Sequence, residues 1–270
     1  MTLILSEAYD PAVHDFHVHS SYSDGYFLEH MVSAAEDAGL DGVGIADHCN
    51  VSARDPMMEY REAMGFNLDM TYERRRAAIE RRRVKADIAV HDAAEIDYHP
   101  ADEAEIEAFL DEAGFDYVVG SVHELRGKNV HEPYFERFSE AERETIVDEY
   151  FDAVVSLVDS GLFDILAHPD IVERNTALRG LATGEHYHEV ADALASSGTV
   201  PELNAGRINS SYGQFHPNTE FLSVLSEYDV EITIGSDAHD PDAVRDCVPA
   251  LRDRVAELGL TVASQSAVLE

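Results

Sequence analysis

The sequence is poor in basic residues. It has 19 lysines and arginines against 54 aspartates and glutamates, and its formal net charge is −35. A surface of this charge repels nucleic-acid phosphates, so we expect no nucleic-acid partner. It stays hydrated at very high salt, and we interpret it as an adaptation to a salt-rich cytoplasm. An acidic surface for a cationic partner is the alternative, but acids spread along the whole chain favour the first interpretation.

Cysteines and long apolar runs are also scarce. Cys49 and Cys247 are the only cysteines, which excludes a disulfide framework or a thiolate metal site and favours a reducing, cytoplasmic location. No apolar run reaches the roughly 18–20 residues of a membrane span, so we expect no membrane association. The first residues, MTLILSEAYD, do not resemble a signal peptide. The oligomeric state stays open.

One stretch, YERRRAAIERRRVK (72–85), departs from the acidic composition. It places six arginines and a lysine on one expected helix. An anion-binding patch is one interpretation. We favour a solvated helix whose arginines pair with Glu73 and Glu80 at helical spacing.

Short apolar segments alternate with amphipathic ones along the chain. The apolar segments predict strands at 13–19, 42–48, 88–97, 117–123, 163–169, 200–206 and 230–239. The segments between them predict helices at 28–38, 70–85, 101–112, 141–160, 185–196, 219–228 and 242–258. Seven such units predict an α/β fold, either a doubly wound open sheet or a barrel. No linker divides residues 1–270, so we expect a single domain.

Metal-binding residue types recur where these strands end. His17 and His19 end the first strand and, being two apart, point to the same face. Later strands end in similar residues: Asp47 and His48, Glu95, His123, His168, and finally Asp237 and His239. In a parallel barrel all carboxyl ends lie on one rim, where such enzymes carry their chemistry. Converging imidazoles and carboxylates at this rim favour metal cations over isolated packing histidines.

The donors are nitrogen and oxygen without thiolate, which favours Zn, Mn or Fe in a catalytic role over a structural zinc site. With Asp24, nine candidate ligands result: His17, His19, Asp24, His48, Glu95, His123, His168, Asp237 and His239. One ion rarely takes more than about six ligands. We therefore expect two or three divalent metal ions, with Glu95 suited to bridge two of them.

The other histidines receive weaker expectations. Those on expected helices, in mid-strand or in loops are assigned to surface or packing: His30, His91, His186, His188 and His216. Three others lie nearer the expected rim, where a role in supporting the ligands is the alternative to packing: His14, His99 and His131. Asp15 is expected to orient His17 from behind.

In order, the segments HDFHVHSSYSDG, ADHCN, EID, GSVHEL, AHPD and GSDAH resemble the motifs of the PHP (polymerase and histidinol-phosphatase) superfamily of metal-dependent phosphoesterases. They extend from about residue 13 to 240. The resemblance implies a distorted TIM-like (β/α)7 barrel with two or three metals on its rim. It implies one metal on His17, His19, Glu95 and Asp237, a second on Glu95, His123 and His168, and a third on His48 and His239, with Asp24 as its remaining candidate.

Three segments most resemble the histidinol-phosphatases of this superfamily: YFDAVVSLVDSGLFDILAHPDIV, PELNAG and ITIGSDAHDP. The composition resembles that of halophilic archaeal proteins. Arg174 and Arg207 follow two of these segments, where the resemblance implies phosphate-binding arginines. Arg207 matches less closely, because the alignment after ELNAG is displaced by about one residue. A guanidinium suits a phosphate dianion because it donates two parallel hydrogen bonds.

The resemblance implies hydrolysis of a small-molecule phosphomonoester, with histidinol phosphate as the expected substrate, by a hydroxide that bridges two metals. Glu95, Asp237 and His239 are expected to take part in the chemistry, and the proton donor to the leaving group is left open. The alternatives are a phosphoesterase acting on a nucleotide or sugar phosphate, and a non-catalytic metal-binding regulatory module. The loops at 49–70 and 124–140 are expected to line the substrate pocket.

Overall fold

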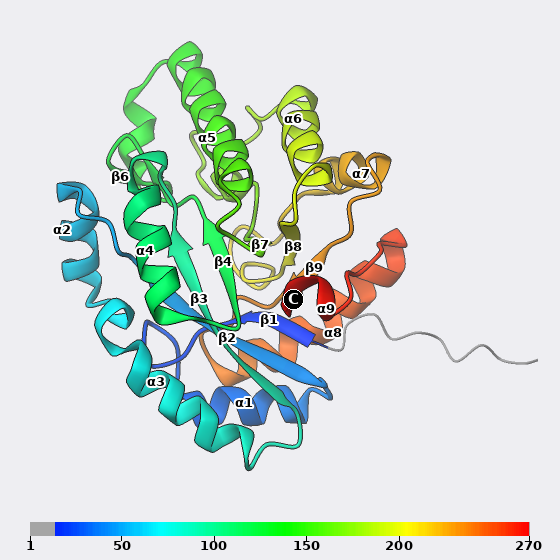
Figure 1. The fold of residues 1–270 in the computed structure, drawn as a ribbon. Coiled ribbons are helices and arrows are strands. Elements are labelled where there is room, and N and C mark those ends of the chain that lie inside the picture. Colours follow the sequence, from blue (N-terminus) through cyan, green and yellow to red (C-terminus); the bar gives the residue numbers. More distant parts are fainter. Residues whose placement is uncertain (1–13, 270) are drawn as a thin grey trace, which may run out of the picture.

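Seven parallel strands form the central sheet (Figure 1). The computed structural model describes residues 14–269, so the expected strand residue Val13 and the stretch Met1–Asp10, where we expected no signal peptide, lie outside the described residues. The strands lie side by side in chain order: β1 (His14–Val18), β2 (Gly42–Cys49), β3 (Ala89–Asp97), β4 (Tyr117–Ser121), β7 (Ile165–Leu166), β8 (Val200–Asn204) and β9 (Thr233–Gly235). All seven expected strands are present, although β7 and β9 are much shorter than expected.

The sheet curls until its first and last strands meet. Val18 forms a parallel bridge with Ala238, and the amide of His19 donates to the Ala238 carbonyl over 3.0 Å. The amide of Asp237 donates to the His17 carbonyl over 2.8 Å. The fold is therefore the nearly closed barrel, and the open doubly wound sheet is excluded. The barrel is distorted, because β4 and β7 share a ladder of only two residue pairs.

Helices cover the outside of the barrel (Figure 1). The seven expected helices lie within two residues of their expected bounds: α1 (Leu28–Asp37), α3 (Leu68–Arg83), α4 (Glu103–Ala113), α5 (Glu140–Ser160), α6 (Gly184–Ala195), α7 (Thr219–Glu227) and α8 (Pro241–Leu258). Helix α5 shows why such ends are predictable. Ser139 and Glu142 form a capping box at its start, and Gly161 ends it with a φ of 66°.

The sequence did not predict several short elements: α2 (Asp55–Met64), the hairpin of β5 (Glu124–Leu125) and β6 (Lys128–Asn129), the 3-10 turns at Pro100–Asp102, Pro133–Arg137 and Ile171–Arg174, and α9 (Ser266–Leu269). Helix α2 buries only Met57, so no apolar stripe reveals it in the sequence. Helix α2 and the hairpin belong to the two expected pocket loops.

Apolar side chains fill the amino-terminal part of the barrel interior. One cluster lies inside the barrel and includes a residue of α9: Phe16, Ala46, Ala93, Tyr117, Val119, Ile165, Ala167 and Val268. Gly44 makes room for Tyr117, because a Cβ at this position would lie 1.6 Å from the Tyr117 hydroxyl. The tyrosine hydroxyl donates to the Phe16 carbonyl over 2.5 Å. This filling leaves the carboxyl end of the barrel as the place for polar side chains.

Arg75 of the basic stretch is buried, so the expectation of a solvated helix is wrong at this residue. Its Nη1 lies 3.0 Å from Oδ2 of Asp47, and its Nη2 lies 2.8 Å from Oδ1 of Asp92. Other arginines of α3 pair with acids of other elements, as Arg76 does with Asp92 over 2.7 Å. The partners of Arg75 and Arg76 lie on β2 and β3 rather than on the helix itself, which the sequence spacing does not reveal.

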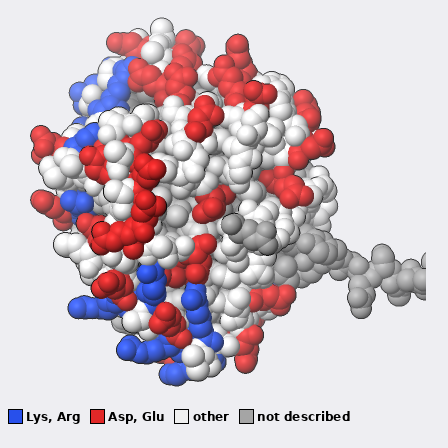
Figure 2. Space-filling model, in the orientation of Figure 1, with Lys and Arg blue, Asp and Glu red and all other residues white. Residues whose placement is uncertain are grey.

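Carboxylates are scattered over the whole face of the molecule in Figure 2. The basic side chains gather at its edges, in particular at the lower edge, where Figure 1 places α3. In residues 14–269, no helix is long and apolar enough to cross a membrane. The distribution fits repulsion spread over the surface rather than one acidic docking patch.

We expect the melting temperature to rise by roughly 5 °C or more between 0.1 M and 2 M KCl, because salt screens the repulsion among the surface carboxylates. Most of the rise should occur below 1 M, because the Debye length has already fallen to about 3 Å at that concentration. Thermal unfolding followed by circular dichroism measures this. A melting temperature that is independent of salt would contradict the interpretation of the acidic composition.

Replacing Arg75 with methionine should lower the free energy of unfolding by about 3–5 kcal/mol, because Asp47 and Asp92 would lose their buried partner. The control is Arg74→Met on the same helix, where the side chain is exposed and the expected change is within about 0.5 kcal/mol. Denaturant unfolding at fixed salt measures both variants. Equal stabilities would mean that the buried ion pairs contribute nothing.

Candidate active site

The nine predicted donors lie together at the carboxyl end of the barrel. Seven of them line one cavity: Asp24, His48, Glu95, His123, His168, Asp237 and His239. His17 and His19 are completely buried beside Glu95. The expectation that the strand ends converge on one rim is therefore confirmed. Asp24 reaches the group from the loop that follows β1, with its Oδ1 3.9 Å from Nδ1 of His19.

Glu95 lies at the centre of the group and is 1% exposed. Its Oε2 is 2.7 Å from Nδ1 of His48, and its Oε1 is 3.0 Å from Nε2 of His168. The Nε2 atoms of three more histidines lie 3.4 to 3.6 Å from its oxygens: His17, His19 and His123. Burial raises the pKa of Glu95, but the charges of His48 and His17 outweigh it and hold the pKa well below its usual range.

His17 and His19 turn ring nitrogens toward each other, with 3.1 Å between their Nε2 atoms. Nδ1 of His17 lies 2.8 Å from Oε1 of Glu202. An ionised carboxylate only accepts, so Nδ1 carries the proton and Nε2 can bind either a second proton or a metal ion. Burial and repulsion from His239 lower the pKa of His19 to about 4, so this imidazole is neutral at neutral pH. The pair is suited to share a cation.

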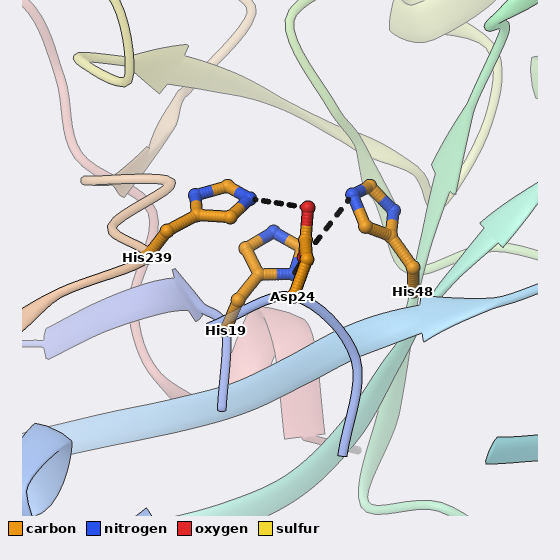
Figure 3. Close-up of side chains that lie close together, drawn as sticks. All are labelled: His19, Asp24, His48 and His239. Atoms are coloured by element: carbon orange, nitrogen blue, oxygen red, sulfur yellow. Dashed lines mark ion pairs between the residues drawn. The ribbon is translucent and has the colours of Figure 1, made fainter. Parts of the chain in front are cut away.

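Three sets of donor atoms lie within 4.8 Å of one another, the spacing that a shared metal ion requires. The first set is His17, His19 and Asp237; the second is His48, Glu95 and His123; the third is His19, Asp24, His48 and His239. Figure 3 shows the third set, with Asp24 between the rings of His239 and His48. The donors therefore fit two or three metal ions with nitrogen and oxygen ligands.

Two carboxylates that sequence reasoning missed orient the imidazoles from behind. Glu202 holds His17, and Asp97 holds His123, with 2.6 Å between Oδ1 and Nδ1. Both fix the proton on Nδ1 and leave Nε2 to face Glu95. Asp97 lies two residues after Glu95 on β3, so spacing within the EID segment was the signal that could have revealed it. Glu202 in PELNAG offered no such signal, because its partner lies 185 residues away.

Asp15 was expected to orient His17, but it does not contact the ring. Its Oδ1 accepts hydrogen bonds from the backbone amides of His17 and Ser236, over 3.1 and 3.0 Å. Asp15 therefore fixes the backbone where β1 meets β9. Gly235 gives Glu202 access to His17, because a Cβ there would lie 1.7 Å from Oε1 of Glu202.

Asp47 ends β2 beside His48, but it points to the loop after β1. Its Oδ1 accepts from the Ser20 amide over 2.6 Å and from the Ser23 hydroxyl over 2.9 Å. Its Oδ2 accepts from the Ser20 hydroxyl over 2.7 Å and pairs with Arg75. The buried arginine therefore supports the loop that carries Asp24.

Arg174 and Arg207 both line the cavity of the donor group. Arg174 is nearly buried, with its side chain 8% exposed, and its Nη2 lies 3.5 Å from Oδ2 of Asp237. Arg207 is exposed. In a chain of charge −35, two guanidinium groups beside the donors make this cavity suitable for an anion.

Some of the remaining histidines lie at the cavity or beside Arg174, and others lie away from both. His216 was assigned to surface or packing, but it is completely buried and accepts a hydrogen bond at Nε2 from Nε of Arg174 over 2.9 Å. His14 does not support the ligands, because it lies at the opposite end of the barrel beside His91, 5.9 Å between ring centroids. His99 caps the turn at Pro100–Asp102 instead. His131 does line the cavity.

The cavity has a volume of about 180 Å³. Tyr60 and Met64 of α2 and the following Phe66 form one part of its wall, and Asn129 and His131 form another. Both belong to the loops at 49–70 and 124–140, which we expected to line the substrate pocket and which here line the cavity of the donors. The wall joins aromatic rings and carboxylates, which suits a small organic cation bearing a phosphate.

The PHP domain family matches residues 15–205 of this sequence. The chain belongs to this family. This PHP domain protein is 27% identical over 252 residues to a probable histidinol-phosphatase of Deinococcus radiodurans, covering 88% of this chain and 92% of that one. It is 26% identical over 147 residues to a probable histidinol-phosphatase of Clostridium acetobutylicum, covering 50% and 54% of the two chains.

Two solved structures share the fold of this PHP domain protein. One is histidinol phosphate phosphatase from Lactococcus lactis, crystallised with zinc, L-histidinol and phosphate; the TM-score is 0.75 at 22% identity, covering 94% of this chain and 96% of that one. The other is a putative histidinol phosphatase from Listeria monocytogenes, with a TM-score of 0.69 at 18% identity, covering 85% and 96%.

Replacing Glu202 with glutamine should lower the affinity for Zn²⁺ or Mn²⁺ by about 10- to 100-fold. The glutamine side chain would direct an N–H toward either Nδ1 of His17 or the backbone N–H of His168. In the wild type both of these groups donate to the Glu202 carboxylate. Calorimetric titration of metal-stripped protein measures the affinity. Glu227→Gln, an exposed change on α7, is the matched control. Unchanged affinity in Glu202→Gln would contradict the orienting role.

Proposed function

We propose that this chain is a metal-dependent phosphomonoesterase that hydrolyses histidinol phosphate to histidinol and phosphate. The single observation that carries the proposal is the cavity in which two arginines lie beside seven of the nine metal-type donors, with the buried carboxylate Glu95 at their centre. The likeness to histidinol-phosphatases over most of the chain supports the choice of substrate. A binding module would not require guanidinium groups at the edge of its metal donors.

The donor sets suggest which residues would hold the metals. Together with the family resemblance, they favour His17, His19, Asp237 and Glu95 for a first ion, Glu95, His123 and His168 for a second, and Asp24, His48 and His239 for a third; the donor atoms also place His48 beside Glu95 and His123. The absence of thiolate favours Zn, Mn or Fe. When bound, such ions lower the pKa of water and neutralise charge on the phosphoryl oxygens.

The chain's own residues would bind the substrate and move one proton. Arg174 and Arg207 would donate to the non-bridging phosphoryl oxygens. When the third site holds no metal ion, His239 is a better proton donor to the leaving oxygen than Asp237; as a ligand of that ion through Nε2 it would have no proton to give. Burial lowers the pKa of His239, but its hydrogen bond to Asp24 and the charge of Asp237 raise it above the ordinary value. The pKa of Asp237 lies well below its usual range, because its hydrogen bond to His19 and nearby positive charges outweigh burial, so Asp237 has no proton to give.

The cytoplasm is the location we propose for this enzyme. Cys49 and Cys247 are both buried and free, as a reducing compartment would keep them. The substrate we propose is a small molecule, and the acidic surface in Figure 2 does not suit a nucleic-acid partner.

In 2 M KCl with Mn²⁺ or Zn²⁺, we expect histidinol phosphate to be hydrolysed with a kcat/KM at least about tenfold above that of p-nitrophenyl phosphate, glucose 6-phosphate or adenosine monophosphate. Phosphate release measures all four. A higher rate on the nucleotide or the sugar phosphate would support a related phosphoesterase instead. No release from any ester by metal-loaded protein would support the binding module.

Site variants and metal chelation test whether the measured hydrolysis depends on the proposed metal centre. Either His17→Ala or Glu95→Ala should abolish activity and reduce the metal content, whereas His188→Ala, an exposed change on α6, should alter neither. EDTA should remove the activity and added Mn²⁺ restore it. Full activity of the Glu95 variant with normal metal content would exclude the proposed centre.

A further inference from the structure

Arg174 is held by a buried histidine that is itself held by a buried carboxylate. Nε of Arg174 donates to Nε2 of His216 over 2.9 Å, and Nδ1 of His216 lies 2.6 Å from Oδ1 of Asp170. His216 and Asp170 are both completely buried. The second oxygen of Asp170 accepts from the amide of Asn218, which caps α7, over 2.8 Å. Both carboxylate oxygens are therefore occupied.

These contacts require one tautomer of His216. Asp170 only accepts when ionised, so the proton lies on Nδ1, and Nε2 presents a lone pair. A guanidinium only donates, so the lone pair matches Nε–H of Arg174. In the series Asp170, His216 and Arg174, every donor therefore meets an acceptor, and only one placement of the imidazole proton allows this.

His216 is also fixed through its backbone and its ring face. Its amide donates to the Asn204 carbonyl over 3.0 Å, and the Asn204 amide donates to the His216 carbonyl over 2.7 Å. Its ring stacks on Tyr212 with centroids 4.7 Å apart. Oδ1 of Asn204 lies 3.4 Å from Nη2 of Arg174. The guanidinium is therefore held on two edges by residues joined to β8.

This restraint matters because Asp237 lies beside the arginine. Nη2 of Arg174 is 3.5 Å from Oδ2 of Asp237, and an unrestrained guanidinium would turn to pair with this carboxylate through two nitrogens. With Nε bound to His216 and Nη2 shared between Asn204 and Asp237, Nη1 has no hydrogen bond to residues 14–269 and is left for a ligand.

We propose that Asp170 and His216 are positioning residues that keep the Arg174 guanidinium from pairing with Asp237 through two nitrogens, so that Nη1 stays available to the substrate phosphate. The inference rests on the proposed function, because it takes the cavity beside Arg174 to be the phosphate site. Neither Asp170 nor His216 touches the phosphate in this arrangement. Both act through the orientation of Arg174.

Two amide variants separate the two hydrogen bonds of His216. Glutamine can place an oxygen near the position of Nε2 and still accept from Arg174, whereas asparagine reaches only the position of Nδ1. We expect His216→Asn to raise the Kd of inorganic phosphate by about 10- to 100-fold in the metal-loaded protein. His216→Gln should keep it within about threefold of wild type. Calorimetry measures the Kd, and metal content should be unchanged in both.

A double-mutant cycle tests whether the effect passes through Arg174. In an Arg174→Met background, His216→Asn should cause no further loss of phosphate binding. Equal losses in the two amide variants, or additive losses in the cycle, would overturn the proposal. Should the asparagine variant not fold, Arg174→Lys keeps the charge without the Nε–H donor, and wild-type phosphate affinity in it would overturn the proposal equally.

The outcome is separable from the proposed function, because phosphate binding is measured without turnover. Weakened binding in His216→Asn supports the positioning role even if the wild-type protein hydrolyses no ester. Conversely, hydrolysis of histidinol phosphate by the wild type, with both amide variants binding phosphate normally, would leave the phosphatase intact and remove the positioning role.

Discussion

One buried carboxylate facing five imidazoles is the constraint on which the site depends. Glu95 is ionised and almost without solvent, so positive charge has to lie beside it, either as protons on histidines or as metal ions. The requirement explains the raised pKa of His48, about 9, where the Glu95 charge prevails over burial. Closure of the barrel brings β9 to β1 and places Asp237 opposite His19, 3.3 Å away, so a second carboxylate adds to the negative charge that must be balanced.

Acidic side chains behind the donors keep the donors in place, and other residues in turn hold these acids. Glu202 and Asp97 orient imidazoles, while Asp47 supports the loop of Asp24 and is neutralised by Arg75. Burying so many carboxylates is costly unless each has a partner. The partners come from different strands and helices, so the site and the fold are stabilised by the same contacts.

The sequence pattern predicts the strands and the donors well because both depend on local order, whereas the choice of a barrel over an open sheet came from the family resemblance. Strand ends are marked by short apolar runs, and His17 and His19, or Asp237 and His239, lie two apart on one strand. The residues that sequence reasoning missed depend on distant partners. Arg75 meets an acid 28 residues away, and His216 meets Asp170 across 46 residues. A histidine in QFHPN or an arginine within RRR has no local pattern that distinguishes burial from exposure.

Strand β8 connects the two halves of the site through residues two apart on one strand. Glu202 bonds to His17 through Oε1, and its Oε2 accepts from Nδ2 of Asn204, whose Oδ1 faces Arg174. The spacing between His17 and the Arg174 guanidinium is therefore set within a single strand. A displacement of β8 would carry both groups together, so the distance between His17 and Arg174 would be preserved.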